Sequence, residues 1–136
     1  MKGKMKKLLL LSTLLIFACS SDDSDSSSSN GNSINPPAWI QGLWLYEDDT
    51  YGYEFRADDF CWYQPAGPIN YTCFKSQIEI HSATNSSASQ NSTENSYQLV
   101  ITLLSFEYHY EFQKISEDTM ACIGCIYGED LILIKQ

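Results

Sequence analysis

The residues of this 136-residue chain best suited to chemistry are its five cysteines. A thiol can join a second thiol, bind a metal or, as the thiolate, attack a substrate. Cys19 follows an apolar run near the N-terminus, whereas the other four cysteines form an even set later in the chain. In an oxidising compartment, an even set in a small domain indicates two disulfides. The four are Cys61, Cys73, Cys122 and Cys125.

A turn signal suggests how these four cysteines pair. Two short aromatic runs that contain Cys61 and Cys73 flank the Pro-Ala-Gly-Pro turn at 65–68. If the runs form a hairpin, the two cysteines lie opposite each other, about 4.5–5.5 Å apart at Cα, and a disulfide can span that distance. Cys122 would then pair with Cys125 across a short loop, and we prefer this connectivity to the other two.

The Cys122-Ile123-Gly124-Cys125 segment also has the spacing of a redox dithiol. Such a dithiol needs its first cysteine at a helix N-terminus, where the helix dipole lowers the pKa of the thiol. Ile126, Tyr127 and a turn follow here instead of a helix, so the sequence favours a structural disulfide. Zinc bound by all four thiolates is the weaker alternative, because the spacing matches no zinc-ribbon pattern.

Residues 1–18 have the composition of a cleaved export signal. Four lysines precede the apolar run from Leu8 to Phe17, and Ala18 supplies the small residue that cleavage requires. The run is too short to cross a bilayer core, which takes roughly 20 apolar residues. Ile16-Phe17-Ala18-Cys19 resembles the lipobox of bacterial lipoproteins, which implies cleavage before Cys19 and lipidation of its thiol. An ordinary secretory signal that ends in cysteine is the alternative.

Residues 19–35 are predicted to be the lipidated cysteine and a disordered tether. Serine and aspartate dominate this stretch, and Ile34 is its only large apolar residue. Such a segment buries too little surface to offset the entropy cost of ordering it. Ser21-Asp22-Asp23 resembles the acidic surface-export signal of Bacteroidota lipoproteins. The resemblance implies an outer-membrane protein, anchored by palmitate-type acyl chains and facing the cell surface.

Residues 36–136 are long enough for one small domain. Four of the eight basic residues precede Cys19, so the mature chain has four basic against 17 acidic residues and a net charge near −13. A surface this acidic repels nucleic acid and anionic lipid. We therefore expect no nucleic-acid partner, and we expect the membrane contact to be made by the N-terminal lipid.

The hydrophobic pattern of this domain has a period of two, which is typical of β-strands. Phe106–Gln113 alternates aromatic and polar residues without a fault, and Tyr97–Leu104, Tyr51–Arg56 and Ser76–His81 follow the same pattern. The polar stretch 82–96 is predicted to be a long hairpin loop or flap. The sequence thus predicts an all-β domain: a small antiparallel meander barrel of about 7–9 short strands, with a β-sandwich as the alternative.

Gly42-Leu43-Trp44, near the start of the strand pattern, resembles the Gly-x-Trp motif that opens the lipocalin barrel. In that family the tryptophan packs across the closed end of the barrel beneath a basic residue of the last strand. The resemblance therefore implies that Lys135 lies over Trp44. It covers Trp39 to Lys135 in outline and implies a lipocalin-like binding domain.

Alternating aromatic residues define the inner face of this predicted barrel. One interpretation is a ligand cavity, lined by rings whose hydroxyls orient a small apolar or sugar-like molecule. The other interpretation is the packed core of a small barrel. The predicted cavity residues are Trp44, Tyr46, Tyr53, Phe55, Tyr108 and Tyr110.

No pattern of residues indicates an enzyme. The sequence has no Gly-x-Ser-x-Gly elbow and no phosphate loop. Asp58-Asp59 lacks the spacing of a calcium loop and is interpreted as a solvated turn. We expect no catalytic residue, cofactor or metal. The expected function is a lipid-anchored lipocalin-like protein that binds a small ligand; the alternatives are an interaction or structural subunit of an outer-membrane assembly, and a hydrolase inhibitor.

Overall fold

The computed structural model of the chain describes residues 27–47 and 50–136. They form ten strands, one α-helix and one short 3-10 helix, η1. In chain order the elements are β1 (Ser27–Gly31), β2 (Gly42–Tyr46), β3 (Gly52–Phe55), β4 (Phe60–Tyr63), β5 (Tyr71–Cys73), α1 (Phe74–Ile80), η1 (Ser82–Thr84), β6 (Ser87–Ser92), β7 (Ser96–Leu103), β8 (Phe106–Lys114), β9 (Thr119–Ile126) and β10 (Glu129–Lys135).

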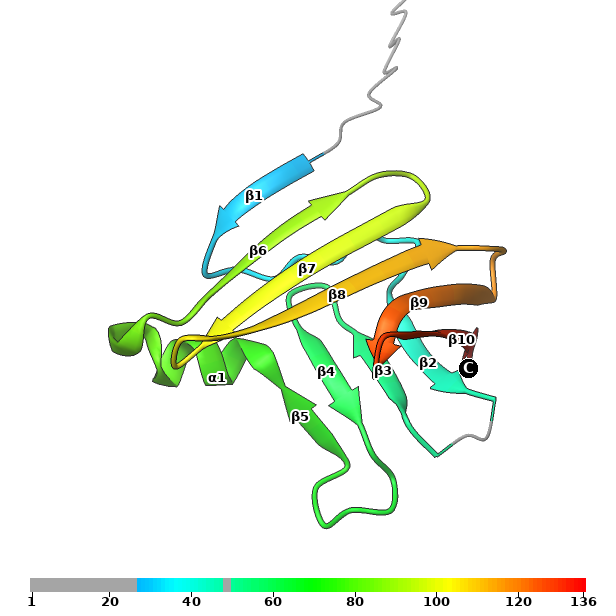
Figure 1. The fold of residues 1–136 in the computed structure, drawn as a ribbon, viewed down its shortest axis with the longest axis horizontal. Helices are drawn as coiled ribbons and strands as arrows, with labels where there is room; N and C mark the ends of the chain where they lie inside the picture. Colours follow the sequence, from blue (N-terminus) through cyan, green and yellow to red (C-terminus); the bar gives the residue numbers. More distant parts are fainter. Residues whose placement is uncertain (1–26, 48–49) are drawn as a thin grey trace, which may run out of the picture.

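All ten strands belong to one antiparallel sheet, in the order β1-β6-β7-β8-β9-β10-β2-β3-β4-β5. Two meanders, β2–β5 and β6–β10, are joined by the pairing of β10 with β2. The sheet curls into a half-barrel with β1 and β5 as its edges (Figure 1). The short α1 links the two halves, because it contacts both β4 and β7. The all-β meander prediction is confirmed, with β1 and β6 as strands that were not expected.

Alternation along the strands builds the core of this half-barrel. On β8, Tyr110 and Phe112 are buried, while Glu111 and Gln113 between and beyond them are exposed. Curling brings β3 against the second meander, so the Phe55 ring lies 4.9 Å from the Phe112 ring. Strand alternation and sheet curvature together therefore place one apolar face of each meander inside.

The last strand covers the buried tryptophan, as the Gly-x-Trp resemblance implied. The Lys135 Nζ atom lies 5.2 Å from the centre of the Trp44 ring, a cation-π arrangement. Below it, the Trp44 indole N–H donates to the Ile40 carbonyl at 2.6 Å. Gly42 has φ +125°, and a Cβ there would lie 3.1 Å from the Lys135 side chain. A glycine at this position thus leaves room for the lysine to cross the ring.

The segment 76–81, predicted to be a strand, belongs instead mainly to α1. Phe74 and Ile78 are one helical turn apart and both are buried, whereas Ile80 is 72% exposed. The period-two spacing of Ile78 and Ile80 suggested a strand. The four-residue spacing from Phe74 to Ile78 instead places both side chains on the buried face of a helix. No helix in the described ranges is long and apolar enough to cross a membrane.

The stretch 82–96, predicted to be a loop, contains η1 and the complete strand β6. Ala88 and Gln90 point inward from β6, and the Gln90 Oε1 atom accepts hydrogen bonds from the Tyr97 hydroxyl and the Asn35 N–H. The sequence does not reveal this strand by alternating apolar residues, because its inward positions are an alanine and a glutamine.

The structure also differs from the predicted tether over residues 27–35. Strand β1 pairs with β6 along its whole length, from Ser27 opposite Ser92 to Gly31 opposite Ala88. Ile34 then enters the core with 1% of its surface exposed. Main-chain pairing needs no apolar side chain, which is why the composition of β1 does not reveal it.

Candidate functional site

The aromatic residues predicted to line a cavity lie mostly in a filled core. Tyr53 is the hub of this cluster, with ring centres 6.0 Å from Tyr110 and 6.5 Å from Phe55. Trp44, Tyr53, Phe55 and Tyr110 are all buried. Ring-on-ring contact of this kind favours the packed-core interpretation of these four residues over the cavity interpretation.

Tyr46, the fifth predicted cavity residue, lies at the edge of the same cluster. Its hydroxyl is 3.2 Å from the hydroxyl of Tyr53. Burial raises the pKa of both phenols, and it does the same for Tyr97 and Tyr110. A phenol is already neutral at physiological pH, and burial extends that neutral range to higher pH, so these hydroxyls act as hydrogen-bonding groups.

The sixth predicted residue, Tyr108, lies outside the filled core. Phe106 and Tyr108 share the inner face of β8 with Tyr110 and Phe112, yet they are 69% and 42% exposed. The Tyr108 ring contacts only the rim of the core, 6.4 Å from the Phe74 ring. The aromatic stripe of β8 therefore continues past the point where the core is filled.

Two further apolar side chains are exposed at this end of the half-barrel. Leu104 is 49% exposed in the β7–β8 turn, and Ile80 is 72% exposed at the end of α1, a helix that contacts β7. We call these four residues the apolar end. It comprises Ile80, Leu104, Phe106 and Tyr108.

A tight turn fixes the geometry of the apolar end. Leu104 and Ser105 have φ 51° and 73°, which is the left-handed region that a two-residue hairpin turn requires. The Leu104 N–H donates to the buried Ser86 hydroxyl at 3.3 Å. A leucine in this backbone region is strained by about 1–3 kcal/mol, so the surrounding contacts must hold it in place.

An open surface pocket of about 480 Å³ lies between the β1–β2 segment, the β3–β4 turn and α1, and we call it the polar cavity after its charged and amide side chains. Lys75 and Asp58 form an exposed ion pair in this lining, and their pairing lowers the pKa of Asp58 and raises that of Lys75. Neutral amide and hydroxyl groups complete a lining suited to a polar ligand. The lining residues are Asn32, Ser33, Ile34, Asn35, Asp58, Lys75 and Glu79.

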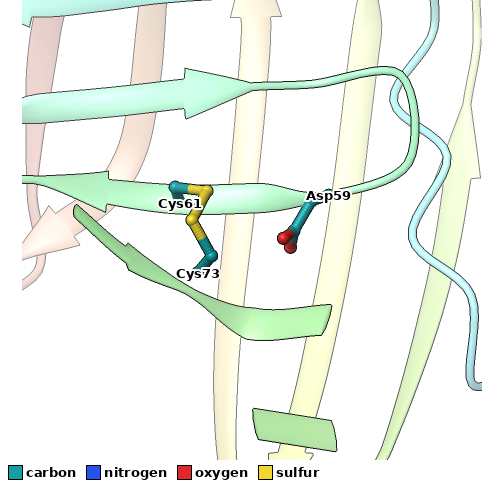
Figure 2. Close-up of side chains that lie close together, drawn as sticks. All are labelled: Asp59, Cys61 and Cys73. Atoms are coloured by element: carbon teal, nitrogen blue, oxygen red, sulfur yellow. A yellow bond between two sulfur atoms is a disulfide. The ribbon is translucent and has the colours of Figure 1, made fainter. Parts of the chain in front are cut away.

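The two predicted disulfides are confirmed as Cys61–Cys73 and Cys122–Cys125. Cys61 and Cys73 are directly opposite each other on β4 and β5, as the hairpin prediction required. Figure 2 shows Asp59 beside this disulfide. These three residues have metal-ligand atoms within 4.8 Å of one another, but both sulfurs are spent in the S–S bond, so no thiolate remains to bind a metal.

Asp59 has a structural role that the sequence did not reveal. It was expected in a solvated turn, yet it is only 8% exposed. Its Oδ1 atom accepts from the N–H groups of Phe60 and Lys75, each at 2.8 Å. Asp59 thereby ties the first turn of α1 to the start of β4. No local sequence pattern predicts this cap, because Asp59 precedes the capped Lys75 by 16 residues.

Comparisons with protein-family models, with curated proteins and with solved structures find no match to this chain. The predicted lipidation site, Cys19, lies outside the described residues. Within the described residues, the two surfaces that could bind another molecule are the exposed apolar end and the polar cavity.

Proposed function

We propose that this chain is a lipid-anchored, non-catalytic binding lipoprotein of the bacterial outer membrane. Its recognition surface is the apolar end, where it docks an apolar segment of another envelope protein. The observation that carries this proposal is the stripe of β8, on which Phe106 and Tyr108 remain exposed in line with the buried Tyr110 and Phe112. The lipobox-like sequence ending at Cys19 supports the anchor.

Exposed aromatic side chains on an inward face indicate a surface that is completed by a partner. Fully burying one such side chain is worth about 1.5–3 kcal/mol. Aromatic residues are also the side chains most enriched where partners bind most tightly. Phe106 and Tyr108 are therefore well suited to anchor an apolar segment. Leu104 in the β7–β8 turn and Ile80 at the end of α1 add further exposed apolar surface at this end.

Charge selects the class of that segment. Glu79 is next to Ile80 in sequence, whereas Glu107 points to the outer face of β8, where it pairs with the exposed His109 at 3.3 Å. The mature chain as a whole has a net charge near −13. Complementary charges steer association and exclude acidic partners. The net charge thus favours an apolar segment that carries lysine or arginine.

Photo-crosslinking in intact cells tests this proposal. The full lipoprotein would carry a benzophenone amino acid in place of Phe106, and the matched control would carry it in place of Tyr127, an exposed aromatic residue in the β9–β10 turn. We expect a protein adduct from position 106 that a peptide of alternating leucine and lysine suppresses and a leucine–glutamate peptide does not. Equal adducts at both positions, or no suppression, would refute the proposal.

The polar cavity favours a second candidate function, the binding of a sugar-like ligand. The paired charges of Asp58 and Lys75 and the amides of Asn32 and Asn35 offer donors and acceptors for hydroxyl groups. Titration with N-acetylglucosamine, followed by NMR, tests it. Binding that Asp58→Asn weakens and Glu117→Gln leaves unchanged would support this function. Unchanged spectra at millimolar sugar would exclude it for this class of ligand.

A further inference from the structure

The chain forms the edge strand β1 of the sheet before it enters the core. Ile34 is buried, and the neighbouring Ser33 and Asn35 line the polar cavity together with residues of α1. This first core contact therefore lies toward the α1 side of the domain. Strand β1 runs from there back along β6, so that Gly31 is opposite Ala88 and Ser27 is opposite Ser92.

Ser27 consequently lies at the end of the domain opposite to the apolar end. Ser92 leads into the β6–β7 turn, and the Lys114 N–H donates to the Asn95 carbonyl there, which places the β8–β9 turn beside it. The β7–β8 turn, with Leu104, is at the other end of β7. Figure 1 shows β1 beginning on the side away from α1.

We infer that β1 orients the anchored domain, with the β6–β7 and β8–β9 turns toward the bilayer and the apolar end directed away from it. This inference rests on the proposed lipid anchor at Cys19. It adds that the partner binds the side of the domain that faces away from the membrane holding the acyl chains. The pairing of β1 with β6 is the device that selects this orientation.

The lengths of the segments support this orientation. Residues 20–26 separate Cys19 from Ser27, and the eight residue steps between these two Cα atoms can span at most about 29 Å. A strand as long as β8, with nine residues, extends about 30 Å. The attached end is thus held closer to the headgroups than the far end. Were β1 unpaired, the tether would end near Ser33 at the α1 side, and this preference would vanish.

The charges at the attached end are consistent with approach to the bilayer but not with insertion. Glu94 lies in the β6–β7 turn, and Glu117 and Asp118 lie in the β8–β9 turn. The Trp39 indole N–H donates to the Thr93 carbonyl at 3.3 Å, so this ring is also held at that end. Desolvating these carboxylates would be costly, and the lipid chains alone enter the hydrocarbon.

Depth-dependent quenching tests the inference on the full lipidated protein. An azide amino acid would replace either Glu117 or Glu107, two exposed glutamates near opposite ends of β8, and would receive the same small fluorophore. In phosphatidylcholine vesicles with a headgroup quencher, we expect at least twofold stronger quenching at position 117 than at 107. Equal quenching, or the reverse order, would overturn the proposed orientation.

A second variant shows whether β1 is the cause. Successive N–H groups of a strand point to opposite sides, so prolines at both Ser28 and Ser29 remove a donor to β6 whichever residue provides it. We expect Ser28→Pro/Ser29→Pro to abolish the difference between the two labels without releasing the protein from vesicles. Ser24→Pro, in the segment before β1, is the control and should preserve the difference.

The same samples distinguish failure of the inference from failure of the proposed anchor. Protein that does not bind vesicles or incorporate a palmitate analogue at Cys19 would refute the lipid anchor. Protein that is lipidated and bound, but quenched equally at both labels, would refute only the orientation. If the double proline variant keeps the quenching difference, β1 is not the orienting element.

Discussion

At the scale of single residues, packing between β2 and β3 leaves no room at Gly52. A Cβ at this position would collide with the Trp44 carbonyl oxygen and lie 2.7 Å from Leu45 Cδ2. We expect Gly52→Ala to lower the free energy of unfolding by about 1–3 kcal/mol, because the backbone of β2 must shift. Urea denaturation measures this free energy. In the control Gly67→Ala, where the nearest atom is 3.5 Å away, the free energy of unfolding should change by less than about 0.5 kcal/mol. Equal losses in the two variants would contradict this packing.

The buried tyrosines predict how stability depends on pH. Burial raises the pKa of Tyr46, Tyr97 and Tyr110 above the ordinary value of 10.0. The folded state thus holds these phenols neutral, while the unfolded chain ionises them near pH 10. Their contribution to stability is therefore complete below about pH 10 and is lost as the pH rises further.

An alkaline titration checks this sign. We expect part of the tyrosinate absorbance to appear only as the far-ultraviolet circular dichroism of the strands is lost, and Tyr110→Phe should remove one phenol from that late part. Complete ionisation of the tyrosines with the circular dichroism unchanged would show that the phenols are not held neutral by the fold.

Some residue roles could be predicted from the sequence because a local rule fixes them. A turn between two aromatic runs puts Cys61 opposite Cys73, and the resemblance at Gly42-Leu43-Trp44 implied Lys135 over the indole. Whether the aromatic face encloses a cavity could not be predicted. Alternation shows which side chains point inward, whereas the distance across the interior depends on how tightly the sheet curls.

At the scale of elements, Asp59 decides where α1 begins. Its carboxylate accepts the Lys75 N–H, which has no partner within the first turn of a helix. We expect Asp59→Ala to destabilise the domain by about 1–2 kcal/mol, whereas Asp59→Asn keeps an oxygen acceptor and should restore much of that loss. Chemical denaturation of both variants measures the effect.

The neighbouring Asp58 provides the matched control for Asp59. It pairs with Lys75 at the surface, where its side chain is 63% exposed. Exposed ion pairs contribute little, so Asp58→Ala should cost less than Asp59→Ala. An equal or larger loss from Asp58→Ala would show that the surface pair, and not the buried cap, holds α1.

The elements that the sequence did not predict are those whose pairing depends on the backbone. Strands β7 and β8 carry apolar side chains at alternate positions and β10 contains a continuous apolar run, so their patterns identified them. Strands β1 and β6 are rich in serine and asparagine, and they are fixed by hydrogen bonding to β7 and to each other. Helix α1 has only seven residues, too few for a periodic signal.

At the scale of the whole molecule, the acidic surface opposes membrane binding and the proposed lipid anchor provides it. After the predicted cleavage the chain has a net charge near −13, which anionic headgroups repel, so in the proposed lipoprotein the acyl chains alone hold it at a membrane. The proposed anchor makes the two ends of the domain distinct: the end where β1 begins would lie close to the membrane, and the apolar end would be free to bind another protein.

This division predicts the behaviour of a chain that cannot be lipidated. We expect Cys19→Ala to abolish labelling by a palmitate analogue and to move the protein from the membrane to the soluble fraction, while Ser20→Ala changes neither. Purified protein without acyl chains should not bind phosphatidylglycerol vesicles at low salt, because charge repulsion is then strongest. Membrane retention of Cys19→Ala, or binding of the unlipidated protein to those vesicles, would mean that the protein surface itself contacts lipid. The apolar end would then be the surface expected to contact lipid, because Phe106 and Tyr108 are two exposed aromatic side chains on one face of β8.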